Sequence, residues 1–224
     1  MRQLRRTAAA LAATAAAMTA IGLAGCGAPA YSYAADHHDH VVFEVPAAWQ
    51  QVDTRSLADA QFVLLSRSAA GPLGGRLAWS RAYAAAVNPP PSALLSGSQE
   101  PVVYASVQNI SDALRAQLSF NYMRDLLFPV TSGDRQQAAL AGVRLTGFSL
   151  AFSHTITTKD GVRGINELFE YNINGLPDAF DQTVLTNSST TKLYLLLVQC
   201  YRNCFLSHEA QIKQIVSSFY VRGF

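Results

Sequence analysis

Two cysteines near the C-terminus, Cys200 and Cys204, are the residues whose type and spacing most directly suggest chemistry. Thiols four positions apart can oxidise to a disulfide or bind a metal, but a zinc site needs about four ligands. Only His208 lies close to the pair in sequence. Disulfides persist in exported proteins, and an even number of cysteines remains once Cys26 has another role. We therefore expect a Cys200–Cys204 disulfide, with a metal site as the alternative.

The motifs of acyl transfer, metalloprotease chemistry and nucleotide binding are absent from the sequence. There is no Gly-x-Ser-x-Gly elbow, and His154 and His208 are the only histidines beyond residue 40. Ile212 stands where a zinc-binding helix starting at His208 needs its second histidine. The glycine-rich segment 71–75 lacks the lysine of a phosphate-binding loop and is predicted to be a turn. We expect no catalytic residues, cofactor or bound metal; a hydrolase of envelope lipids or peptides is the alternative.

A cluster of metal-ligating residue types occurs at Asp36-His37-His38-Asp39-His40. Neutral imidazoles and carboxylates are suitable ligands for zinc, copper or nickel. The cluster belongs, however, to a stretch of small and polar residues without sustained periodicity, which is typical of a linker. We expect residues 26–40 to form a flexible tether, and the sequence leaves open whether the cluster binds metal.

Trp49 and Trp79 are the two tryptophans of the chain. Large aromatic side chains are most often core residues. They also line the apolar clefts that bind lipid-like molecules. We expect core positions for both and keep ligand binding as the alternative role.

The first 26 residues have the three parts of a secretory signal. Arg2, Arg5 and Arg6 precede an alanine-rich apolar run over 7–21, and Leu23-Ala24-Gly25-Cys26 follows. This ending resembles the bacterial lipobox, which implies cleavage after residue 25 and diacylation of the Cys26 thiol. The run is shorter than the roughly 20 strongly apolar residues of a membrane-spanning helix. We expect a signal peptide over 1–25 and anchoring through Cys26 to the outer face of the cytoplasmic membrane.

Composition indicates one folded domain over 41–224. Half of the 224 residues are hydrophobic and 14% are charged, which suits a chain with a sizeable core. Without Arg2, Arg5 and Arg6 the chain has 14 basic and 15 acidic side chains. A near-neutral domain lacks the basic surface that nucleic-acid binding requires, so nucleic acid is not an expected partner.

Short β-rich segments dominate the domain. Lys159-Asp160-Gly161 is predicted to be the turn of a hairpin. In its second arm Ile165, Phe169 and Tyr171 share one face, which Glu167 interrupts. The run 193–198 is apolar on both faces, as expected of a central strand. Strands are expected at 41–45, 61–66, 76–83, 141–153, 162–174, 182–187 and 193–199.

Two helices complete the predicted fold. Ser111 is a suitable N-cap for a helix that ends before Pro129, and Ile212 and Ile215 recur at helical spacing near the C-terminus. The proline-rich segment 88–101 is expected to be an exposed loop. Strands in consecutive hairpins with two helices favour an α+β fold, an antiparallel sheet flanked by helices.

Motifs at both ends of the domain support a family resemblance. Phe43-Glu44-Val45-Pro46 is followed by Trp49, and the chain closes on Ile215-Val216-Ser217-Ser218-Phe219-Tyr220-Val221. With the lipobox, these motifs resemble the actinobacterial, mycobacterial-type lipoproteins of PsbP-like fold, the LpqN/LpqT-like family, over about residues 41–221. The proline-rich loop 88–101 departs from the family pattern.

This resemblance carries expectations about fold and function. It implies an α/β/α sandwich and a membrane-anchored, non-catalytic binding module for a cell-envelope glycolipid or a membrane transport partner. A purely structural scaffold lipoprotein is a further alternative.

Overall fold

The computed structural model describes residues 30–54, 76–89 and 97–222. Cys26, the leader, the strand expected at 61–66 and the turn expected at 71–75 lie outside these residues, as does the middle of the expected loop 88–101, residues 90–96. Within the described part of the chain, no helix is long and apolar enough to cross a membrane.

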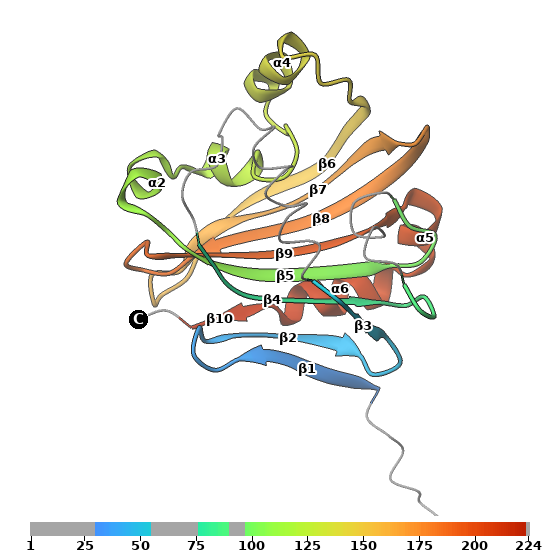
Figure 1. Cartoon of the computed structure of the whole chain (residues 1–224), viewed down its shortest axis with the longest axis horizontal. Coiled ribbons are helices and arrows are strands. Elements are labelled where there is room, and N and C mark those ends of the chain that lie inside the picture. The colour runs from blue at the N-terminus through green and yellow to red at the C-terminus, as the bar shows by residue number, and fades with distance from the viewer. Residues whose placement is uncertain (1–29, 55–75, 90–96, 223–224) are drawn as a thin grey trace, which may run out of the picture.

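A seven-stranded antiparallel sheet forms the centre of the fold (Figure 1). Its order is β3-β4-β5-β9-β8-β7-β6, so β9 is central, as the apolar run 193–198 predicted. The hairpin of β6 and β7 is also confirmed. The strand bounds are β3 Gln50–Val52, β4 Arg76–Ala84, β5 Val102–Asn109, β6 Thr146–Thr157, β7 Arg163–Ile173, β8 Leu176–Thr186 and β9 Lys192–Tyr201.

A second, three-stranded sheet corrects the expected tether. β1 (Tyr31–Asp36) pairs with β2 (Val41–Pro46), and β10 (Tyr220–Val221) pairs with the other edge of β2. The expectation of a flexible segment is therefore wrong for residues 31–40. β1 is stabilised by its pairing with an apolar strand and by Ala34, which is buried opposite Phe43, and neither contact is visible in the local sequence.

Of the described helices, α2 and α3 lie over one face of the large sheet and α5 and α6 cover part of the other, while α4 stands near the start of β6 with none of its residues buried (Figure 1). Ser111 caps the first helix as expected, its hydroxyl accepting a hydrogen bond from the Leu114 amide at 3.2 Å. The single helix expected up to residue 128 is wrong, because Leu118 is extended and Ser119 caps a new helix. The bounds are α2 Asp112–Gln117, α3 Phe120–Arg124, α4 Ser132–Leu140, α5 Arg202–Ser207 and α6 Glu209–Ser218.

Two hydrophobic cores lie on opposite faces of this sheet. Phe169, Tyr171 and Phe180 pack towards α2 and α3. On the other face, Leu196 and Ile215 belong to a core that also contains residues of β2, including Phe43. An antiparallel sheet with helices on both faces confirms the α+β class.

Candidate functional site

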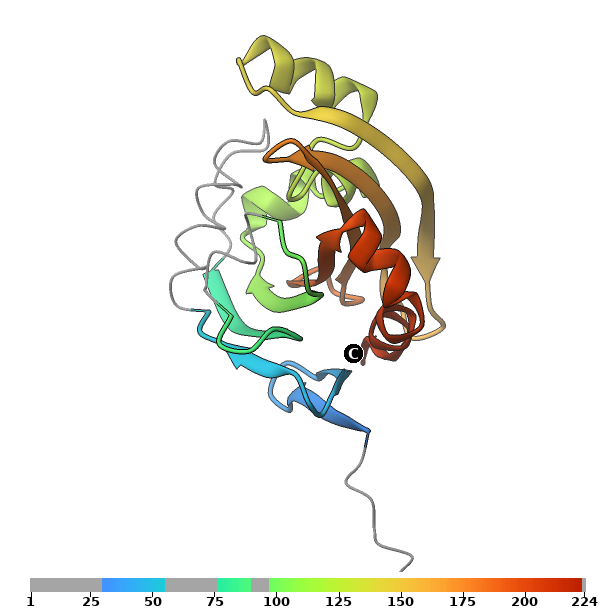
Figure 2. The same cartoon turned by 90° about the vertical axis from the view of Figure 1, so that its right-hand side faces the viewer.

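A cleft of about 530 Å³ opens between α6 and strands β6 to β8. It exists because α6 packs against β2 and β9, at the middle of the sheet, and leaves the outer strands uncovered on this face. Figure 2 shows α5 and α6 in red beside these strands, with β6 at the outer margin. The apolar walls come from both sides of the cleft: Phe152, Ile156, Leu168 and Leu185 from the sheet, and Phe205, Ile212, Val216 and Phe219 from the C-terminal segment.

Three polar side chains of the sheet line the cleft, and we call them its floor: Asn166 on β7, and Asp181 and Thr183 on β8; Glu209 and Lys213 line it from α6. The Asn166 amide nitrogen donates to Asp181 Oδ1 at 2.8 Å and to Thr183 Oγ1 at 3.0 Å. Asp181 is only 8% exposed, and this burial raises the pKa of its carboxyl to about 6, against the hydrogen bond from Asn166. Since the amide donors are already used, this floor offers acceptors to a ligand that carries hydroxyl or amine groups.

The neighbouring residues on the same strands point into the opposite core. Glu167 and Gln182 form the next cross-strand pair and are fully buried. The Gln182 side-chain nitrogen donates to Glu167 Oε1 at 3.1 Å and to the carbonyl oxygens of Met123 and Arg124 at 3.2 Å each. Burial raises the pKa of Glu167 to about 8. Glu167, the residue that interrupts the apolar pattern of β7, thus ties α3 to the sheet through Gln182.

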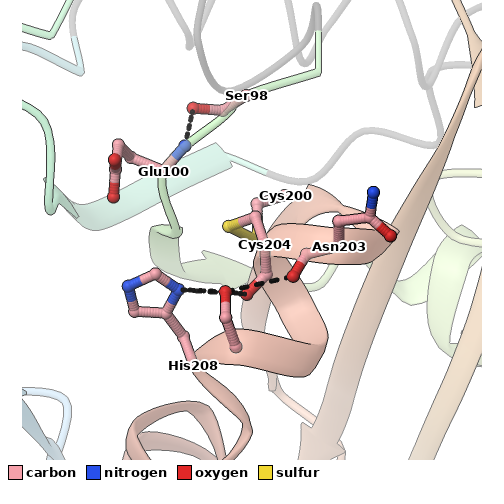
Figure 3. The surroundings of a disulfide bond; sticks show 7 residues. Ser98, Glu100, Cys200, Asn203, Cys204 and His208 are labelled. Atoms are coloured by element: carbon pink, nitrogen blue, oxygen red, sulfur yellow. Dashed lines mark hydrogen bonds between the residues drawn. A yellow bond between two sulfur atoms is a disulfide. The ribbon is translucent and has the colours of Figure 1, made fainter.

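The cysteine pair lies where β9 meets α5 (Figure 3). The sulfur atoms of Cys200 and Cys204 are 2.12 Å apart, at disulfide distance, as expected. Since each sulfur is bonded to the other, the geometry does not support the alternative metal site. A ring nitrogen of His208, Nδ1, lies 3.0 Å from the carbonyl oxygen of Cys204, so this histidine belongs to the end of α5.

The histidine and aspartate cluster at residues 36–40 spans the last residue of β1 and the turn that leads to β2. Asp36, His38 and Asp39 place one ligand atom each within 4.8 Å of the others. The Lys192 ammonium forms an ion pair with Asp39, which is 3% exposed. Burial opposes ionisation of Asp39, but hydrogen bonds from Lys192 and His38 outweigh it and lower its pKa. The lysine already neutralises the carboxylate that a metal would need, so the cluster joins the first hairpin to β9.

Neither tryptophan contributes to the cleft. Trp79 is buried in the core that faces α6, and Trp49 packs against the same core while partly exposed. The residues that sequence reasoning missed are Asn166, Asp181 and Thr183. For Asn166 the sequence held a signal, because period-two alternation places it on the face of β7 opposite the apolar residues. Asp181 had none, because it lies one residue before the strand expected at 182–187.

Comparisons with known proteins bear on the fold. No protein-family model matches the chain, and no curated protein matches it. Among solved structures, cyanobacterial PsbP from Synechocystis sp. PCC 6803 has a TM-score of 0.50 at 13% identity, covering 91% of this chain and 98% of that one. LpqN of Mycobacterium tuberculosis, described as involved in cell envelope biogenesis, has a TM-score of 0.46 at 12% identity over 81% of this chain and 83% of its own. The Ran-binding protein Mog1p of Saccharomyces cerevisiae has 0.44 at 7%, over 86% and 96%. The chain therefore has a PsbP-like fold.

Proposed function

We propose that this chain is an exported lipoprotein, anchored through Cys26 at the outer face of the cytoplasmic membrane, that binds an envelope glycolipid in the cleft between α6 and the sheet. The observation that carries the proposal is the composition of this cleft, with apolar walls around a floor of hydrogen-bond acceptors. Such a site has the size and character of small-molecule sites, which span roughly 300–1,000 Å³. The proposed role is binding without catalysis.

The walls and floor fit the two parts of a glycolipid. Leu168, Leu185 and Val216 offer apolar contact to an acyl chain. Asp181, with a pKa of about 6, is largely ionised at neutral pH and accepts hydrogen bonds from sugar hydroxyls. Asn166 fixes the carboxylate through its amide, so the floor is held in position before a ligand arrives.

Binding can be tested with a defined probe and two matched variants. Asp181 and Asp178 are buried aspartates on the same strand, but only Asp181 lines the cleft. Dansyl-labelled decyl glucoside is titrated into the full chain in lipid nanodiscs, with empty nanodiscs subtracted. Asp181→Asn is expected to weaken binding about tenfold, since a hydrogen bond to a charged group contributes about 1.5–3 kcal/mol. Asp178→Asn is expected to bind as the wild type does.

The outcomes separate the proposal from its rivals. Equal binding by both variants and the wild type would rule out the cleft as the site. Turnover of an ester or peptide panel, abolished by one serine or histidine substitution, would support a hydrolase instead. If the probe does not bind but crosslinking in cells captures a membrane protein, a transport partner or a scaffold role replaces the glycolipid.

The anchor has its own test. Radiolabelled palmitate is expected to enter the wild-type chain and not the Cys26→Ser variant, because the thiol is the acceptor. Two or three acyl chains hold a protein on a membrane, whereas a single chain binds marginally. Normal processing and detergent partitioning of Cys26→Ser would disprove the anchor without affecting the binding proposal.

A further inference from the structure

The outer edge of β6 pairs with no strand in the described part of the chain, although β6 is twelve residues long. Its sequence, Thr-Gly-Phe-Ser-Leu-Ala-Phe-Ser-His-Thr-Ile-Thr, contains no aspartate, glutamate, lysine, arginine or proline. Natural proteins usually protect a long edge with such residues or by shortening the strand. The opposite edge of the same sheet follows that rule, because β3 has only three residues.

Irregular pairing protects only the first half of β6. The register with β7 shifts between Thr146 and Ser149 and again between Leu150 and Phe152. From Phe152 to Thr157 the pairing is regular, each residue opposite the next along β7. Bulges hinder pairing at an edge, so the segment 152–157 is the part able to accept a further strand.

The residue types in this segment are arranged symmetrically about His154. His154 has a hydroxyl residue on each side, Ser153 and Thr155, and an apolar residue beyond each of these, Phe152 and Ile156. In a two-fold interface residue i of one copy meets residue j of the other, and j meets i. Antiparallel pairing centred on His154 therefore places Phe152 opposite Ile156 of the second copy, twice, and Ser153 opposite its Thr155.

We infer that the chain self-associates through antiparallel pairing of β6 with β6 of a second copy, centred on His154. Aromatic residues opposite β-branched residues, and serine opposite threonine, are favourable cross-strand pairs. The strand carries no fixed charge, so two copies of it do not repel each other when they pair. A partner strand of opposite charge is therefore not needed. Phe152 and Ile156 also line the cleft, and the pairing extends the sheet that forms the cleft wall.

Cysteine crosslinking tests the register in the full chain. Directly opposite residues in an antiparallel pair have Cβ atoms about 4.5–5.5 Å apart. His154→Cys in membranes of expressing cells is expected to form a covalent dimer under mild oxidation, at about ten times the yield of Ser149→Cys. Ser149 is an exposed residue of the same strand in its irregular half and faces no counterpart in this register. The wild-type chain gives the background, since Cys200 and Cys204 are already joined and the proposed anchor uses the thiol of Cys26.

A charge exchange at His154, whose side chain is exposed, provides the second test. Two differently tagged copies are co-expressed and co-purified. His154→Lys in both copies is expected to reduce co-purification about tenfold, since like charges directly opposite are destabilising. His154→Lys with His154→Asp restores it, and Ser149→Lys in both copies has no effect. Equal crosslinking at positions 149 and 154, or wild-type association of His154→Lys, would disprove the self-association, as would crosslinks from β6 to another protein only.

Discussion

The two faces of strands β7 and β8 use the same kinds of residue for opposite purposes. Glu167 and Gln182 face α3 and are sealed in a core, where the Gln182 amide nitrogen donates to Glu167 and to the helix backbone. One residue along each strand, Asn166 and Asp181 face a side that α6 does not cover, and the acceptors of Asp181 open into the cleft. The position of the covering helix, more than the polarity of the residues, decides which polar pair stabilises the fold and which is available to a ligand.

The largest expected difference between the faces follows from truncating the two neighbours on β8. Gln182→Ala leaves a cavity and removes the donor to Glu167 and to two α3 carbonyl oxygens, so we expect a loss of about 3 kcal/mol in the free energy of unfolding. Asp181→Ala is expected to cost less than about 1 kcal/mol, because its carboxylate borders the cleft. Urea unfolding at pH 7 measures both. Equal losses would contradict the distinction between a sealed and an open face.

The disulfide restrains only the face that carries α6. Replacing both Cys200 and Cys204 by serine is expected to cost about 2 kcal/mol, the low end for disulfides, since the closed loop is very short. Both cysteines belong to the core that faces α6, so amide hydrogen exchange should accelerate in α5 and α6 and remain unchanged in α3. Reduced wild-type protein serves as the control and should behave like the double variant; uniform acceleration across both faces would argue against a local restraint.

The free energy of unfolding should depend on pH mainly through buried carboxyl groups on the face of the sheet that α3 covers, above all Glu167. The folded-state pKa of Glu167, about 8, lies above its ordinary value of 4.5, so the folded protein binds this proton more tightly than the unfolded chain does. The resulting stability is complete below pH 4.5 and is lost as the pH rises through about 8. Melting temperatures of the wild type should fall by several degrees between pH 5 and 9.

Variants on the two faces should flatten different parts of this pH profile. Glu167→Gln removes the Glu167 proton and should flatten the profile between pH 4.5 and 8, including the part above pH 7 that neither Asp178 nor Asp181 reaches. Asp181→Asn should flatten only the part below about pH 6, because the pKa of Asp181 is about 6. An unchanged slope in Glu167→Gln would show that another group carries the dependence.

The smallest expected effect concerns Asp178, which is buried on the same side as Gln182. Neither of its carboxylate oxygens has a partner within full hydrogen-bond geometry among the described residues, and burial raises its pKa to about 7, against the Ala179 amide, which lowers it. Asp178→Asn should therefore increase the unfolding free energy by about 1 kcal/mol at pH 8, where the wild-type residue is charged, and by progressively less as the pH falls towards 3.8, the ordinary pKa of the group. A loss of stability at pH 8 would indicate an interaction with the charged form.

The contrast between the faces also explains what sequence reasoning could predict. Patterns within one strand were sufficient for the hairpin turn at 159–161, the central position of 193–198 and the exceptional Glu167. They failed for α4, because none of its residues is buried and its sequence has no apolar stripe. They also failed for β1, whose strand character depends on pairing with β2.

The cleft could not be predicted because its two walls are distant in the sequence. Phe152 and Asp181 meet Val216 only because α6 crosses the sheet at β9 and leaves β6 to β8 open. The tryptophans were chosen for their residue type, and that type says nothing about where a helix leaves a face uncovered. The disulfide was predictable because both partners lie within five residues of each other.

If Cys26 is the anchor, as proposed, the early start of the first hairpin limits the distance between the domain and the membrane. Five residue steps separate Cys26, the proposed anchor, from Tyr31, which pairs in β1. Even fully extended, they span at most about 18 Å. A domain held so near the bilayer cannot ferry cargo across a wide aqueous gap. Under the proposed anchoring, it would lie close to the surface of its own membrane and meet only molecules that protrude from the outer leaflet or dock beside it.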